Sequence, residues 1–267
     1  MSKIEAKKSL GQHFLSSDKL LQKIVETGRI EPADVILEIG PGYGHLTEKL
    51  LQKAGKVVAV EKDDRLISIL QEKFAAEISS GRFEIVHADI LTFELSYSQL
   101  IANRYKLIAN LPYYITGKFL RKFLEAENKP LLAVLMLQKE VAGRIVSQKG
   151  SILSISVKTF GKPKYVATVK RGNFKPQPKV DSAILLIDEI SGNFFREIHQ
   201  EKFFKILKAG FAQKRKKLIG NLSHYYDKEL LFKAFSQCGI EENARAEELG
   251  LENWRQLTQY IEKYKSL

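Results

Sequence analysis

The segment Asn110-Leu111-Pro112-Tyr113 combines residue types that could activate an amine attached to an aromatic ring. Such an amine is a weak nucleophile, because its lone pair is delocalised into the ring. Two acceptors aimed at its hydrogens, the Asn110 side-chain oxygen and the Leu111 carbonyl, would free the lone pair, so that the rate gain comes from positioning. Pro112 fixes the turn, and Tyr113 offers a ring on which an extruded base can stack. Taken alone, the segment also fits an ordinary strand-to-loop turn.

Three glycines form a second candidate site. Gly40, Gly42 and Gly44 follow an apolar run, and a glycine turn between a strand and a helix brings backbone N–H groups close to a ligand. The dinucleotide fingerprint requires the spacing G-x-G-x-x-G, but the third position of that pattern is His45 here. The spacing therefore disfavours a dinucleotide and favours a different nucleoside cofactor.

Two carboxylates follow the next two predicted strands. Glu61 closes one strand and Asp89 follows the other, and the carboxyl ends of strands form the edge at which open α/β sheets bind ligands. A carboxylate at position 61 can accept both hydroxyl protons of a ribose, which the neighbouring Lys62 cannot do. Either acid alone is better explained as a solvated residue. Together, behind a glycine turn, they indicate a nucleoside-binding edge.

The elements that must position these residues alternate short apolar runs with amphipathic stretches, the pattern of βα units around a parallel sheet. We predict strands over residues 35–39, 56–60, 83–87, 105–109, 131–137, 165–170 and 180–187. Residues 151–160 fit either a strand or a helix. Helical periodicity takes over after residue 190. The sequence thus predicts an α/β domain with an N-terminal arm over residues 1–190 and a small helical domain over residues 191–267.

Composition narrows the possible partners. The chain carries 43 Lys and Arg against 31 Asp and Glu, a net charge of +12, which suits a polyanion such as a nucleic acid but also fits a basic protein without such a partner. Cys238 is the only cysteine and the histidines lack metal-ligand spacing, so we expect no metal. No secretory signal and no run near the roughly 20 apolar residues of a membrane helix are present. We therefore expect a cytoplasmic protein with no membrane partner.

Further motifs carry a resemblance to known families. Glu38-x-Gly40-x-Gly42-x-Gly44 resembles the first motif of the Rossmann-like methyltransferases, and residues 110–113 are similar to the catalytic motif of amino-methyltransferases. Three other stretches resemble the rRNA adenine N6,N6-dimethyltransferases: residues 8–15 (KSLGQHFL), 173–183 (NFKPQPKVDSA) and 211–218 (FAQKRKKL). The matches run in order from residue 7 to beyond residue 222. The resemblance implies a Rossmann-like, S-adenosylmethionine-dependent methyltransferase sheet with a small C-terminal helical domain.

The resemblance also implies roles for particular residues. S-adenosyl-L-methionine is the implied cofactor, and its implied contacts are His13, Leu15, Gly40, Gly42, Glu61, Asp89 and Asn110. Catalysis is implied for residues 110–113, with Phe174 completing a base sandwich opposite Tyr113. The alternative for Phe174 is a loop hydrophobe packed on the core. The implied RNA contacts lie on a basic helix that contains Lys214, Arg215, Lys216 and Lys217. Cys238 lies in the helical region, which argues against a cysteine-dependent attack on a pyrimidine ring.

Within the family, the N-L-P-Y form and the basic helix look more like the small-subunit enzymes (the KsgA type). That type implies dimethylation of two adjacent adenines near the 3′ end of small-subunit rRNA and a role in subunit biogenesis. One alternative is the Erm type, which dimethylates one adenine in large-subunit rRNA and more usually carries isoleucine at the position of Leu111. Another is a ribosome-assembly or transcription factor without catalysis, although a pure binder has no need of all the site residues. We expect a monomer that acts on rRNA, in the context of the small subunit.

Overall fold

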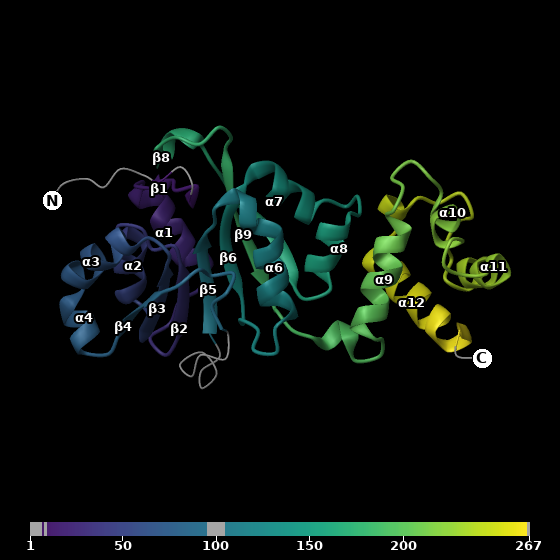
Figure 1. Cartoon of the computed structure of the whole chain (residues 1–267), viewed down its shortest axis with the longest axis horizontal. Helices are drawn as coiled ribbons and strands as arrows, with labels where there is room; N and C mark the ends of the chain where they lie inside the picture. Colours follow the sequence, from purple (N-terminus) through teal and green to yellow (C-terminus); the bar gives the residue numbers. More distant parts are fainter. Residues whose placement is uncertain (1–6, 8–9, 95–104, 266–267) are drawn as a thin grey trace. The chain divides into compact units, whose positions relative to one another are not determined.

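The computed structural model describes residues 7, 10–94 and 105–265 of the chain and divides into two compact units (Figure 1). The first unit comprises Met1–Ala142 and Lys162–Ile190, and the second comprises Gly143–Gly161 and Ser191–Leu267. The segment 143–161 thus groups with the helical unit rather than with residues 1–142, where the sequence analysis placed it. The reason is its buried Ile155, which belongs to the hydrophobic core of the second unit.

A seven-stranded sheet forms the centre of the first unit. Its strands lie in the order β4-β3-β2-β5-β6-β9-β7. The first five are parallel, whereas β9 runs antiparallel to β6 and β7 antiparallel to β9. Their bounds are β2 (Val35–Ile39), β3 (Lys56–Glu61), β4 (Phe83–His87), β5 (Tyr105–Asn110), β6 (Ala133–Gln138), β7 (Lys162–Val169) and β9 (Ser182–Asp188). The predicted α/β fold is confirmed, with strand ends that differ by a few residues from those expected.

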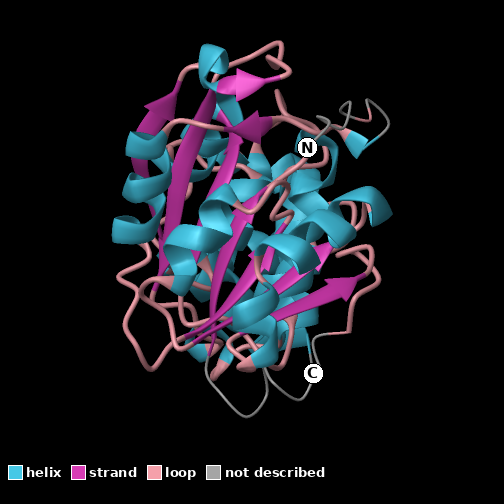
Figure 2. Cartoon of the chain, turned by 90° about the vertical axis from the view of Figure 1, so that its left-hand side faces the viewer, coloured by secondary structure: helices cyan, strands magenta, loops and turns pink. Residues whose placement is uncertain are grey.

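Helices cover both faces of this sheet (Figure 2). All five residues of β2 are therefore buried, as expected for a central strand of a parallel sheet. At the start of α3 the Asp63 side chain accepts the Arg65 N–H, which caps the helix. The helices of this part of the chain are α1 (Asp18–Thr27), α2 (His45–Leu51), α3 (Asp64–Lys73), α4 (Ala75–Ser79), α6 (Thr116–Glu125) and α7 (Lys139–Val146).

A second, two-stranded sheet ties the N-terminal arm to a distant loop. β1 (Phe14–Leu15) pairs antiparallel with β8 (Phe174–Lys175), so that Phe14 lies opposite Lys175 and Leu15 opposite Phe174. The Ser16 N–H extends the pairing by donating to the Asn173 carbonyl. Sequence patterns did not predict this sheet, because strands of two residues show no periodicity.

The second unit is helical. Its elements are α8 (Ile152–Lys158), α9 (Gln200–Gly210), α10 (Leu218–Leu222), α11 (Lys228–Gln237) and α12 (Leu251–Lys265), around a core that includes Phe203, Phe235 and Trp254. The structure thus makes the ambiguous segment 151–160 a helix. Ser151 caps that helix through a reciprocal pair of hydrogen bonds with Ser154.

The prediction that the basic residues 214–217 lie on a helix is wrong. These residues form a turn between α9 and α10. The buried Asn221 side chain donates to the carbonyls of Gly210 and Gln213, at 2.7 and 3.1 Å, and so closes the turn. The amide of Leu218 donates to Ala244 and not to a preceding helical carbonyl. Contacts from elsewhere in the unit therefore override the local helical pattern.

Candidate active site

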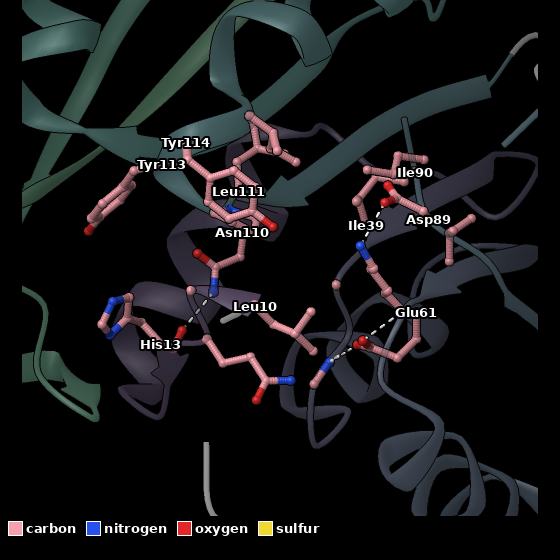
Figure 3. A pocket seen from close by; sticks show the side chains of 18 of the residues that line it. Leu10, His13, Ile39, Glu61, Asp89, Ile90, Asn110, Leu111, Tyr113 and Tyr114 are labelled. Atoms are coloured by element: carbon pink, nitrogen blue, oxygen red, sulfur yellow. Dashed lines mark hydrogen bonds and ion pairs between the residues drawn. The ribbon is translucent and has the colours of Figure 1, made fainter. Parts of the chain in front are cut away.

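The candidate site lies at the carboxyl ends of β2 and β5. These neighbouring strands are separated in the chain by β3 and β4, which lie on the other side of β2, and open α/β sheets bind ligands at such a switch point. A cavity of about 980 Å³, counted to its open mouth, occupies this place. It is lined by Gly40 and Gly42 after β2, by Glu61 and Asp89 after the next strands, and by residues 110–115 (Figure 3).

The glycine turn leaves bare backbone at the floor of the cavity. Gly40 and Gly42 have φ values of +68° and +59°, which L side chains rarely adopt. A Cβ on Gly42 would lie 2.9 Å from the Phe14 ring, and one on Gly40 would lie 3.6 Å from the Asn110 carbonyl oxygen. The arm can therefore approach the turn closely only because position 42 is glycine, whereas at position 40 the requirement for glycine comes from the positive φ.

Glu61 is held by backbone donors. Its Oε1 accepts the N–H groups of Lys62 and Asp63, both at 2.8 Å, and its Oε2 lies 3.4 Å from the Gly42 nitrogen. Burial raises the pKa of Glu61, while these N–H groups oppose the rise. Among the described residues, the Oε2 atom makes only this one long contact. It can therefore accept further hydrogen bonds from a ligand in the cavity, which Gly42 and Glu61 both line.

Asp89 faces the same cavity from the end of β4. Its Oδ1 accepts the Leu91 N–H at 2.9 Å, and its Oδ2 accepts from the Lys62 ammonium at 2.8 Å. The Lys62 hydrogen bond, followed by that of Leu91, lowers the pKa of Asp89. The carboxyl group is therefore ionised and acts only as an acceptor.

The Asn110 amide is oriented by the N-terminal arm. Its Nδ2 donates to the His13 backbone carbonyl at 3.1 Å. Since a carbonyl can only accept, this contact fixes which amide atom is nitrogen. The Oδ1 atom lies on the side of the Tyr113 ring (Figure 3) and accepts no hydrogen bond within the described ranges. One acceptor is thus available where the sequence analysis expected it.

The aromatic residues of the predicted base sandwich are both in the cavity wall, but differ in exposure. Tyr113 is half-buried, its hydroxyl lies 2.8 Å from Ser182 Oγ, and burial raises its pKa. Phe174 is 3% exposed and belongs to the hydrophobic core, although it also lines the cavity. Leu15 lies in that core as well and does not line this cavity. The stacking role of Phe174 and the cofactor contact of Leu15 stay predictions.

Two features of the site were missed by sequence reasoning. The arm is anchored by Gln12, whose side-chain amide donates to Asp63 at 2.8 Å, and the Asp63 carboxylate is fully buried. Behind the glycine turn, Glu38 is buried, accepts the Thr47 hydroxyl at 2.7 Å and has its pKa raised to about 8 by desolvation. Glu38 is the first residue of the glycine motif and Asp63 lies two residues after Glu61, and these positions were the available signal.

The predicted RNA-contacting residues lie in the second unit. No contact of their described side chains identifies a ligand. Lys214, Arg215 and Lys217 are exposed, and Lys216 Nζ lies 3.0 Å from His224 Nε2. Their contact with RNA stays a prediction. Cys238 is buried in the core of the same unit.

Two searches of the described residues concern metals and membranes. Nowhere in residues 7, 10–94 and 105–265 do three His, Cys, Asp or Glu side chains gather as a metal ion would require. Within the same ranges, every helix is too short or too polar to cross a membrane.

Comparison with known proteins places this geometry among rRNA-modifying enzymes. The model of the family described as ribosomal RNA adenine dimethylase matches residues 3–263. The chain is 43% identical to ribosomal RNA small subunit methyltransferase A of Dehalococcoides mccartyi, over 95% of this chain and 88% of the relative. The homologue of the same name from Enterococcus faecalis is 38% identical, over 97% and 91% of the two chains.

Solved structures show the same similarity. A dimethyladenosine transferase from Plasmodium falciparum superposes with a TM-score of 0.83 at 27% identity, over 94% of this chain and 98% of the other. The 23S rRNA methyltransferase ErmE superposes with a TM-score of 0.74 at 26% identity, over 93% and 99%.

Proposed function

Because the chain belongs to the ribosomal RNA adenine dimethylase family, we propose that it dimethylates the N6 amines of two adjacent adenines near the 3′ end of small-subunit rRNA. The family assignment confirms the resemblance inferred from the motifs and makes the chain an S-adenosylmethionine-dependent enzyme. One observation carries the proposal. The Asn110 amide, whose nitrogen donates to the His13 carbonyl, lines the same cavity as Glu61 and Asp89.

The residues of the cavity fit S-adenosylmethionine. In the proposal, Glu61 accepts the ribose hydroxyl protons, because its Oε2 keeps acceptor capacity. Asp89 accepts from the adenine amine of the cofactor, because its carboxylate is ionised and faces the cavity. Gly40 and Gly42 leave room for the remainder of the molecule along bare backbone. When bound, the cofactor supplies an electrophilic methyl group.

The residues of the catalytic segment prepare the target amine. Asn110 Oδ1 and the Leu111 carbonyl accept its two hydrogens and so direct the nitrogen lone pair. This contribution is positional, and it grows as the nitrogen becomes tetrahedral in the transition state. Pro112 holds the segment, and Tyr113 stacks on the extruded base with Phe174 on the opposite side. The product of one transfer keeps an N–H, which allows the second.

The small subunit is favoured over the large subunit by the order of similarity. Relatives named for the small subunit are 35–43% identical to the chain, whereas the large-subunit enzyme is 26% identical. The net charge of +12 supports an RNA partner, to which Lys214, Arg215, Lys216 and Lys217 contribute in this proposal.

An acceptor experiment tests the function. The protein is incubated with methyl-labelled S-adenosylmethionine and either small subunits lacking the modification or deproteinised large-subunit rRNA, and the nucleosides are analysed after digestion. We expect dimethyladenosine from the small subunits, formed far more slowly with Asn110→Ala. Dimethyladenosine from the large-subunit rRNA alone would assign the chain to the Erm type. Absence of product from both would contradict the enzymatic proposal and leave a binding role in ribosome assembly.

The cellular setting follows from the substrate. We propose that the chain acts as a monomer, without a metal, on a partly assembled small subunit in the cytoplasm. The cavity residues named above all come from one chain. Sedimentation of the purified protein tests the monomer, and fractionation of growing cells tests association with precursor subunits.

A further inference from the structure

Tyr114 stands out among the residues of the cavity because its ring is exposed. It is 65% exposed, the largest value among the large hydrophobic residues that the structure leaves open, whereas the neighbouring Tyr113 is half-buried. The ring nevertheless lines the cavity, and its hydroxyl extends toward the side formed by Ile39 and Asp89 (Figure 3). With about two thirds of its surface open, the ring is available to a ligand in the cavity.

The N-terminal arm passes close to the Tyr114 ring. Gly11 has a φ of +62°, and a Cβ at that position would lie 3.4 Å from Tyr114 Cε1 and 3.5 Å from Pro112 Cβ. The space beside Gly11 is therefore bounded by the Tyr114 ring and by Pro112, so this part of the arm runs next to the ring.

The opposite rim is formed by Lys62 and Asp89. The Lys62 ammonium lies 2.8 Å from Asp89 Oδ2, and the Lys62 side chain is half exposed. The hydrogen bond and charge of Asp89 raise the pKa of Lys62, and the phenol of Tyr114 is close enough to add to the effect. The Tyr114 ring thus lies across the cavity from Asp89, which holds the Lys62 side chain at the adenine end of the proposed cofactor site (Figure 3).

We propose that Tyr114 is a cofactor-binding residue, whose ring covers the adenosine part of S-adenosylmethionine from the mouth of the cavity, opposite the Lys62–Asp89 ion pair. This inference rests on the proposed function, since it takes the cavity to be the cofactor site. The ring supplies contact area at the open side, where the backbone floor and the two carboxylates supply none. Asp89 holds the Lys62 side chain along the other rim.

Binding of S-adenosylhomocysteine, measured by titration calorimetry without RNA, tests the inference. We expect Tyr114→Ala to raise the Kd by about 10-fold, the order of magnitude for removal of a stacked aromatic ring. Tyr114→Phe keeps the ring and should bind within about 2-fold of the wild type. Tyr225→Ala is the matched control, because Tyr225 is 56% exposed and belongs to the second unit. The melting temperature of each variant reports whether it folds.

The outcomes separate this inference from the function on which it rests. A folded Tyr114→Ala protein that binds S-adenosylhomocysteine as tightly as the wild type overturns the inference, and a raised KM for RNA in that variant would assign the ring to the RNA instead. A wild-type protein that does not bind S-adenosylhomocysteine overturns the proposed function and the inference together. Weakened binding in Tyr114→Ala, with Tyr114→Phe and Tyr225→Ala unchanged, supports the inference.

Discussion

The buried Glu38 should make the stability of this protein fall with pH in the neutral range. Its pKa is about 8 in the folded chain, above the ordinary value of 4.5, because burial desolvates the carboxylate. Between these values the folded chain keeps the proton and the unfolded chain releases it. The stabilisation present below pH 4.5 is therefore lost as pH rises through 8. The full loss is about 5 kcal/mol, of which about 2–3 kcal/mol falls between pH 6 and pH 9.

Glu38→Gln is the perturbation that isolates this effect. The amide keeps the volume of the side chain, and its oxygen can still accept the Thr47 hydroxyl, but it has no proton to lose. Urea unfolding at pH 6 and pH 9 measures the free energy of unfolding of both proteins. We expect the variant to gain about 2–3 kcal/mol relative to the wild type between the two pH values. Other titrating groups are common to both proteins, so most of their effects cancel.

The control for this experiment is Glu48→Gln on α2. The Glu48 side chain is 55% exposed, and its hydrogen bond to Lys73 lowers its pKa, so any pH-dependent contribution to stability disappears in acid rather than above pH 6. Its free energy of unfolding should follow that of the wild type from pH 6 to pH 9. Parallel profiles for wild type and Glu38→Gln would refute the reasoning, because they would mean that Glu38 does not hold its proton in the folded state.

Three further predictions concern catalysis, packing and RNA. Asn110→Ala should lower kcat by about 10²- to 10³-fold, the range for losing one group that acts in the transition state, and a kcat within about 3-fold of wild type in single-turnover assays would contradict its role. Gly44→Ala should unfold at lower urea than Gly81→Ala, because both have φ near +74° but a Cβ on Gly44 would lie 2.5 Å from the Phe74 ring while one on Gly81 meets nothing. Replacing Lys214, Arg215, Lys216 and Lys217 with glutamine should weaken RNA binding and flatten its salt dependence, and an unchanged salt slope would exclude the turn from the interface.

The sequence predicts the parts of the fold that obey simple patterns. Buried strands such as Val35–Ile39 are largely apolar runs, interrupted here only by Glu38. The polar residues that end or follow the strands, Glu61, Asp89 and Asn110, meet at one edge because parallel strands end together. Functional residues at strand ends are accordingly visible before the structure is known.

The remainder depends on contacts between distant residues. The pairing of Leu15 with Phe174 and the hydrogen bond from Gln12 to Asp63 leave no periodic signal. The predicted basic helix was wrong for the same reason, since the Asn221 side chain closes a turn that local propensity does not indicate. The burial of Phe174 and the exposure of Tyr114 could not be predicted either, because burial depends on neighbours that include residues of the arm.

The pairing of β1 with β8 has a meaning for the polypeptide during its synthesis. A nascent chain that has emerged to residue 170 already contains Gly40, Glu61, Asp89 and Asn110, but not the strand that holds the arm. His13, whose carbonyl orients the Asn110 amide, directly precedes β1 and so depends on that strand. Competence to bind the cofactor should therefore arise only after residues 174–175 have left the ribosome, well after the sheet has begun to form. The arm is made before the sheet and is among the last parts to take its place.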